Sequence, residues 1–420
     1  MYSNSHMVTN MLYWLAQSVF AETPVVQTGY RGSWQGFRMN DGSTSVQQGI
    51  HLRVHSQWTG GVETYVDIMD GRVWGSETTP KTNKDQFANL YEGYLRLSFG
   101  TVNGYHQTLT IGKQEVIVNR ERFLSRGNWG LYGRSFNGIV FRGRKDQESW
   151  QAGFLQLRDG DVYETTCAGQ TCSVVSHGDL LWFANWDTNW GDLDVQPYYL
   201  HLRENETDTD WTIERRIHSP GVKLQQNWTS WFVMGDAAWQ WGQASSTKDH
   251  QAWMAVGEIG YQKNKWKSSF YIEHNSGDGD LEDSIDQNFE SFFGAYHGLR
   301  GWMDIVGGTN LQDAALRIQF PIVDHWTGIA HAHNFRMPEP TGQLYRHNKN
   351  VIGIGTGNDN PSLGQELDLI ALHKPLPGVS IKWAHSIFFP KGIKTKTLGE
   401  APIHFSYVWL VVDRGVQSRF

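Results

Sequence analysis

Short segments in which apolar and polar residues alternate recur along the chain, and they constrain its fold more than any other feature. In GIHLRVHSQW (49–58), Leu52 and Val54 flank Arg53. A β-strand places alternate side chains on opposite faces, so each segment predicts a strand with one apolar and one polar face. Similar segments are EGYLRLSFG (92–100), NGIVFRGRK (137–145), FLQLRDGD (154–161), PYYLHLRENE (197–206), AALRIQFPI (314–322) and IHFSYVWLVV (403–412). No long stretch has the 3.6-residue period of an amphipathic helix, so we predict little helix.

The composition helps to decide what the apolar faces contact. The chain has 20 Trp, and aromatic residues make up 13% of its 420 residues. Tryptophan at this density is typical of the two interfaces of a membrane. No run of about 18 apolar residues exists, so a transmembrane helix is not expected. Nothing outside the alternating segments supplies a second layer over their apolar faces, which disfavours the alternative of a soluble sandwich or β-helix.

We therefore predict an all-β protein, a closed antiparallel transmembrane β-barrel. At about 20 to 25 residues per strand and connection, the chain length gives about 18 strands, in the range 16–18. The apolar faces, such as Leu200 with Leu202 and Tyr407 with Trp409, are then expected to contact lipid. Their polar neighbours are expected to face an aqueous lumen, because a barrel of this size is too wide for side chains to fill.

Two local features bear on targeting and on the cellular compartment. MLYWLAQSVFA (11–21) resembles the apolar part of a secretion signal with Ala21 at its end, although no basic residue precedes it. We predict residues 1–24 to be a signal peptide or an N-terminal extension, and residues 25–420 to form one barrel domain. Cys167 and Cys172 lack the spacing and partners of a zinc site, so we predict a disulfide and an oxidising compartment.

Arginine recurs among the polar residues that alternate with aliphatic ones. A charged side chain at the lipid face costs about 2–4 kcal/mol at the bilayer midplane, so these residues are assigned to the lumen. Guanidinium groups are permanently charged and would favour anions in a narrow passage. The alternative is that they pair with inward carboxylates and stiffen the wall. The residues are Arg53, Arg96, Arg142, Arg144, Arg158, Arg203 and Arg317.

Four segments resemble the alginate-export family of outer-membrane barrels. They are LTIGKQEVIVNRERFLSRGNWGLYGRSFNGIVFRG (109–143), EHNSGDGDLEDSIDQNFESFFGAYHGLRGWMD (273–304), TNLQDAALRIQF (309–320) and SLGQELDLIALHKPLPGVSIKWAHSIFFPKG (362–392). The resemblance implies an 18-stranded barrel in the outer membrane of a Gram-negative bacterium, and export of an anionic polysaccharide through an arginine-lined constriction. By motif, the family's lumen residues correspond to Lys113, Arg134, Glu366 and Asp368, with Lys113 in place of the family's arginine.

Two clusters could bind cations. Asp278, Asp280 and Asp283 form an oxygen-rich set suited to Ca²⁺, but they lack the ligand order of an EF-hand, and the alternative is a solvated loop. His331 and His333 lie on one side of a predicted strand, where we expect polar lumen residues. A transition metal bound there would need a third ligand. Otherwise no cofactor is expected.

The predicted function is a passive channel for anionic solutes, an anionic polysaccharide among them. The alternative is a barrel that acts as a scaffold or sheath for partner proteins of the cell envelope. The chain has no G-x-S-x-G motif, so we do not expect an enzyme. A net charge of −7 argues against a nucleic-acid partner. The expected partners are membrane lipid, the solute and, under the alternative, periplasmic or envelope proteins.

Overall fold

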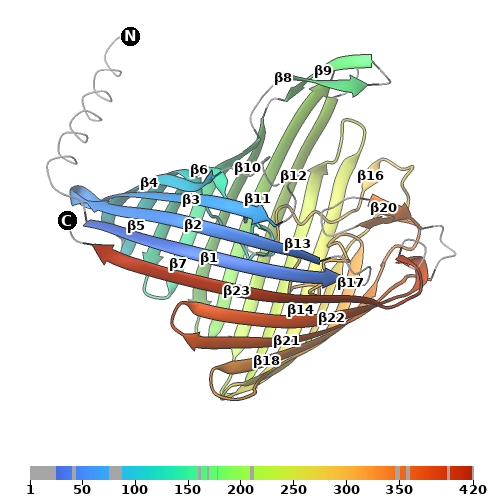
Figure 1. Ribbon diagram of the computed structural model, residues 1–420. Coiled ribbons are helices and arrows are strands. Elements are labelled where there is room, and N and C mark those ends of the chain that lie inside the picture. The colour runs from blue at the N-terminus through green and yellow to red at the C-terminus, as the bar shows by residue number, and fades with distance from the viewer. Residues whose placement is uncertain are drawn as a thin grey trace, which may run out of the picture.

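A single large antiparallel sheet accounts for almost all the regular structure of the chain (Figure 1). The computed structural model describes residues 25–39, 44–74, 88–127, 129, 131–158, 162–167, 170–176, 178–208, 212–345, 351–355, 360–394 and 398–418. The predicted signal segment 1–24 lies outside them. Within the described residues, no helix has the length and apolar character needed to cross a membrane.

The sheet closes on itself. In the described part of the chain it has 21 strands, of which 18 form a ring of neighbouring antiparallel pairs. The ring closes because β1 pairs with β2 on one side and with β23 on the other, from Val26↔Ser418 to Met39↔Phe405. A closed sheet leaves no edge with unpaired backbone groups, which hydrocarbon would not tolerate. The predicted closed antiparallel β-barrel is confirmed.

The strands of the ring follow one another in chain order. They are β1 (Val25–Met39), β2 (Thr44–Trp58), β3 (Val62–Val73), β4 (Asn89–Val102), β5 (Tyr105–Gln114), β6 (Phe136–Lys145), β7 (Glu148–Arg158), β10 (Asp179–Trp190), β11 (Leu193–Asp208), β12 (Thr212–Asn227), β13 (Trp231–Gln243), β14 (Asp249–Lys263), β15 (Trp266–Asn275), β17 (Leu311–Pro321), β18 (Trp326–Arg336), β21 (Ser362–Leu376), β22 (Val379–Pro390) and β23 (Ile403–Ser418). The connections contain β8 (Val162–Cys167), β9 (Gln170–Ser176), β16 (Ile285–Asp286), β19 (Gln343–Tyr345), β20 (Val351–Ile354) and the short 3₁₀ helices η1 (Thr59–Gly61) and η2 (Gly392–Lys394).

The two ends of the barrel differ in their connections. At one end, here called the short-turn end, β4 joins β5 through 103–104 and β14 joins β15 through 264–265. At the other, the long-loop end, β5 joins β6 through 115–135 and β15 joins β17 through 276–310. Such asymmetry is typical of transmembrane barrels. We call 115–135 and 276–310 the inner loops, because Phe123, Leu124, Phe289 and Phe292 within them are buried in one cluster with inward side chains of the wall.

The outer surface is apolar, as expected for a wall in contact with lipid. Leu52 and Leu316 are 59% and 58% exposed. Trp190, which is 69% exposed, stands beside a connection at the short-turn end. Exposed tryptophans recur beside other short turns, which matches the aromatic belt at a membrane interface. They are Trp228, Trp231 and Trp266. Further exposed aliphatics include Leu95, Ile111, Ile139, Val222, Ile272, Ile318, Leu367 and Leu369.

In some strands, however, the apolar face points inward, and there the sequence prediction is wrong. Leu200 and Leu202 of β11 are buried, and they belong to one hydrophobic cluster with Phe123 and Phe289 of the inner loops. Leu155 and Leu181 of neighbouring strands belong to the same cluster, and Tyr407 of β23 is buried in another. The physical reason is that the inner loops bring aromatic residues into the barrel, and burying apolar area against them excludes water as effectively as lipid does.

Candidate functional site: the lumen and its inner loops

The inner loops contact each other as well as the wall. The amide of Phe293 donates to the carbonyl of Phe123 at 2.9 Å, and the amide of Ala295 donates to the carbonyl of Glu121 at 2.7 Å. The ring of Phe123 packs 5.9 Å from that of Phe292. Backbone pairing and aromatic packing together make one body of the two loops, and this body narrows the lumen.

A buried cluster of charges ties this body to the wall. Glu273 of β15 accepts hydrogen bonds from Nε and Nη2 of Arg300 at 2.9 and 2.6 Å. Arg122 of the other loop places Nη1 3.1 Å from Glu273 and Nε 3.4 Å from Asp236 of β13. Nη2 of Arg122 donates to the hydroxyl of Tyr271 at 2.9 Å. One wall carboxylate therefore holds a guanidinium from each inner loop.

The electrostatics of this cluster keep Arg122 charged. Burial alone lowers the pKa of Arg122, but Tyr271, Glu273 and Asp236 more than offset that effect and raise the pKa well above its ordinary value. Asp236 receives further hydrogen bonds, from Nδ2 of Asn119 at 2.7 Å and from the hydroxyl of Tyr198 at 2.8 Å. Buried charges persist only where such partners surround them.

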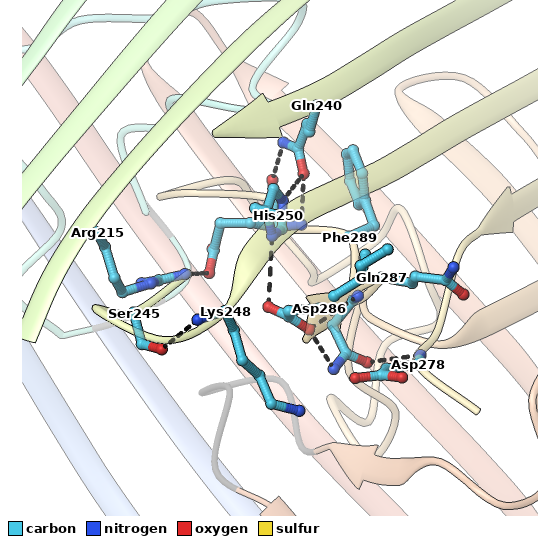
Figure 2. A network of polar contacts seen from close by, with 12 residues as sticks. Arg215, Gln240, Ser245, Lys248, His250, Asp278, Asp286, Gln287 and Phe289 are labelled. Atoms are coloured by element: carbon cyan, nitrogen blue, oxygen red, sulfur yellow. Dashed lines mark hydrogen bonds and ion pairs between the residues drawn. The ribbon is translucent and has the colours of Figure 1, made fainter. Parts of the chain in front are cut away.

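A second polar network fixes the first part of loop 276–310 (Figure 2). The side chain of Gln240 in β13 donates to the carbonyl of Glu290 at 2.7 Å and accepts from its amide at 2.9 Å. Arg215 of β12 donates to the carboxylate of Glu290 at 3.2 Å, and His250 of β14 lies 3.3 Å from Asp286. The wall therefore positions both the backbone and the side chains of this loop.

Two adjoining cavities lie between the inner loops and the strands β2, β3, β22 and β23. The first, of about 280 Å³, is lined by His51, Arg53, Asp67, Glu92 and Arg126 among others. The second, of about 550 Å³, is lined by Arg126, Trp129, His297, Trp302, Lys382 and Trp409 among others. Because Arg126, Gly133 and Trp409 line both, the cavities adjoin, and we call them together the lumen passage.

Several predicted lumen arginines do face the interior, and most of them have partners there. Arg53 lies 3.4 Å from Asp67 and 3.2 Å from Asp413. Arg96 lies 3.3 Å from Glu63. Arg142 donates to the Thr110 hydroxyl at 3.2 Å and to the Gln114 side chain at 3.0 Å. Arg317 donates to the Leu299 carbonyl at 2.7 Å, and Arg134 donates to the Phe293 carbonyl. Arg144 is exposed on the same strand face as Arg142.

The two predicted carboxylates are buried in the wall. Glu366 accepts hydrogen bonds from the amides of Trp302 and Met303 at 2.6 and 2.9 Å, and Asp368 accepts one from the Ser386 hydroxyl at 2.5 Å. Glu366 thus fixes loop 276–310 from β21. Whether any of these charged residues selects solutes stays a prediction.

Two predicted lumen residues lie on the outer face instead. Arg203 follows the buried Leu202 and shares the face of the exposed Tyr199, because the apolar face of β11 packs on the inner loops. Lys113 pairs with the exposed Asn137 on the face of Ile111, while Gln114 points inward. Long cationic side chains on an outer face reach water by extending toward the interface.

The remaining predictions concern Arg158, the two cysteines and the acidic loop 278–283. The side chains of Arg158, Cys167 and Cys172 lie outside the described residues. The carboxylates of Asp278, Asp280 and Asp283 accept hydrogen bonds from the amides two residues further on, at 3.1, 3.2 and 2.8 Å. These bonds fold the loop, and calcium binding there stays a prediction.

The sequence did not identify the residues that hold the inner loops or the lysine that lines the passage. Arg122, Arg126 and Arg300 lie in loops without alternation, where the sequence offers no signal for an inward position. Lys382 could have been found, because it alternates with Trp383 in a strand whose Ser386 faces inward. Nζ of Lys382 lies 4.7 Å from the ring centre of Trp302 and 4.9 Å from that of Trp409.

Comparisons with known proteins agree with this architecture. The model of the alginate export family matches residues 31–390. Similar solved structures include outer membrane protein OpdK from Pseudomonas aeruginosa, with 14% identity, a TM-score of 0.61 and coverage of 93% of this chain and 99% of that one. OccAB2 from Acinetobacter baumannii is similar too, with 11% identity, a TM-score of 0.62 and coverage of 93% and 98%. No curated protein matches. The chain is therefore a member of the alginate export family, an outer-membrane β-barrel channel of a Gram-negative bacterium.

Proposed function

We propose that the protein conducts anionic solutes, an anionic oligo- or polysaccharide among them, by diffusion along the lumen passage. The observation that carries this proposal is the position of Lys382 in the larger cavity. Its ammonium group contacts the rings of Trp302 and Trp409, and among the described residues no carboxylate lies within ion-pair distance of it. No carboxylate of the described residues therefore competes with a passing anion for Lys382, whereas Arg53 and Arg96 already pair with carboxylates.

The aromatic lining of the same cavity supports a sugar as the solute. Trp129 stacks on His297 with ring centres 3.5 Å apart and planes inclined by 7°. Trp302 and Trp409 line the same cavity, and both of them contact the Lys382 ammonium group. The C–H face of a sugar ring is apolar and packs on such flat surfaces, while its carboxylate needs a cation. Weak contacts of both kinds allow entry without preventing release.

The first prediction concerns the charge at position 382. Lys382→Glu should lower the ratio of anion to cation permeability at least about fivefold, which is the factor for one unit charge acting on one ion. A unit charge about 8 Å from the ion path contributes about 2 kcal/mol at an effective dielectric constant near 20, and salt near 0.1 M screens roughly half of that. The measurement is the reversal potential in a planar bilayer under a KCl gradient, repeated with potassium salts of uronate oligomers.

Lys374→Glu is the matched control, because Lys374 is exposed at the short-turn end and does not line the passage. Its reversal potential should equal that of the unmodified protein. An unchanged potential in Lys382→Glu would contradict the proposal. If the intact, folded protein carried no current at all, the channel would be excluded in favour of a scaffold for envelope proteins.

A further inference from the structure

Three metal-ligating side chains converge on the inner side of the wall. His331 and His333 come from β18 and Asp368 comes from β21, and one ligand atom of each lies within 4.8 Å of the other two. The strand register places His331 directly opposite Asp368, which fixes this proximity through the backbone. Among the described residues, this is the one group of three or more such side chains that close together.

His333 is oriented as metal-binding histidines are. It is 3% exposed, and its Nδ1 lies 2.9 and 3.1 Å from the two carboxylate oxygens of Asp313. Its Nε2 is buried and has no hydrogen-bond partner among the described residues. A carboxylate on one ring nitrogen fixes the tautomer and leaves the other nitrogen as a lone-pair donor, the arrangement seen around metal-bound histidines.

Asp368 is the carboxylate of this group of three, and it is fully buried. The residue is 0% exposed, its Oδ1 accepts from Ser386 at 2.5 Å, and its carboxyl group also forms a side-chain hydrogen bond with Glu366. Glu366 is the other member of this buried pair, and its Oε1 accepts from the amides of Trp302 and Met303. A buried acceptor left unsatisfied is costly, and three carboxylates here, those of Asp313, Glu366 and Asp368, share a small buried region. A cation here would bind the unpartnered Nε2 of His333 and offset the negative charge of the clustered carboxylates.

His331 completes the set while contacting loop 276–310. Its Nδ1 accepts a hydrogen bond from the indole Nε1 of Trp302 at 3.4 Å, a contact that leaves the other ring nitrogen for a ligand role. Arg317 is a neighbouring cation of His331, and it is directed at the ring of Tyr271 and the carbonyl of Leu299. The cluster therefore sits where β18 and β21 meet the loop that narrows the lumen.

We propose that Nε2 of His333, a carboxylate oxygen of Asp368 and a ring nitrogen of His331 bind a divalent first-row transition metal ion. Two imidazoles and one carboxylate suit Zn²⁺ and Co²⁺, with water or Glu366 completing the coordination. Calcium is disfavoured, because it prefers oxygen ligands alone. The bound ion would hold Trp302 in place through His331. This inference stands on the ligand geometry and does not depend on which solute the channel conducts.

The test uses the full chain, purified in detergent, treated with a chelator and then titrated with Co²⁺ and separately with Zn²⁺. We expect one equivalent of Co²⁺ with a ligand-field absorption in the visible range, displaced by Zn²⁺. His333→Gln and Asp368→Asn should each abolish that signal. Asp313→Asn should weaken binding about 10- to 100-fold, because Asp313 only orients His333.

His55→Gln is the matched control, because His55 is another half-buried lumen histidine that pairs with a carboxylate, Glu63. It should bind Co²⁺ as the unmodified protein does. Equal binding by His333→Gln would overturn the proposal, as would the absence of a ligand-field signal from the folded, unmodified chain. Should His333→Gln fail to fold, His331→Gln, a change at a less buried position, provides the same comparison.

Discussion

Replacing Glu273 with glutamine should release both inner loops from the wall and raise the conductance of the channel. The glutamine keeps the size of the side chain but removes the charge that Arg300 and Arg122 share. Removing one partner of a buried ion pair typically costs about 3–5 kcal/mol, because the remaining charge stays buried without compensation. The loops can avoid that cost by moving their guanidinium groups into the aqueous lumen.

Single-channel conductance and limited proteolysis from the long-loop end together measure this release. The variant should conduct more current, and should be cut within 115–135 or 276–310 at protease concentrations that leave the unmodified protein intact. Glu258→Gln on the adjacent strand β14 is the control, because no ion pair of Glu258 is found among the described residues. If Glu273→Gln kept both the conductance and the protease resistance of the unmodified protein, the cluster would not hold the loops.

The barrel itself could be predicted because its signal is local. In AALRIQFPI, Leu316 and Ile318 are exposed on the outer face while Arg317 points inward, as the alternation requires. The segments on which the prediction rests each carry such a pattern within about ten residues, and the number of strands follows from the chain length. Closure follows from the physics of lipid, which no open sheet edge could satisfy.

The direction of the apolar face could not be predicted for every strand. The leucines of β11 alternate as cleanly as those of β17, yet Leu200 faces Phe123 and Leu316 faces outward. Alternation states that the two faces differ, but not which of them is covered. In β11 the cover comes from loops far away in the sequence, so Arg203 was assigned to the wrong face.

The partners of the lumen arginines could not be predicted from the sequence either. Arg53 pairs with Asp413, 360 residues away, because closure of the ring brings β2 and β23 to either side of β1. Pairing with carboxylates was the alternative interpretation of these arginines, and the structure shows it for Arg53 and Arg96. Arg142 and Arg317 have neutral partners instead. Lys382, to which we assign the selectivity, is a lysine that the arginine pattern could not indicate.

Leu316→Arg should destabilise the barrel by about 2–4 kcal/mol in a lipid bilayer, because Leu316 lies near the middle of β17 and points outward. In the register it stands between Phe270 of β15 and Ala332 of β18, with no acidic residue at either position. The measurement is urea unfolding of the protein in liposomes.

The control lies on the same strand. Gln319→Arg introduces the same side chain on the face of Arg317, close to the short-turn end, and should change stability by less than about 0.5 kcal/mol. The comparison separates the two environments, because an exposed leucine is unfavourable in water but favourable in the hydrocarbon of a bilayer. On the surface of a water-soluble protein, arginine at position 316 would be tolerated as well as at 319. Equal stability of the two variants would therefore show that the outer face of β17 does not contact hydrocarbon, and only a clear penalty at Leu316 is consistent with a wall that spans the membrane.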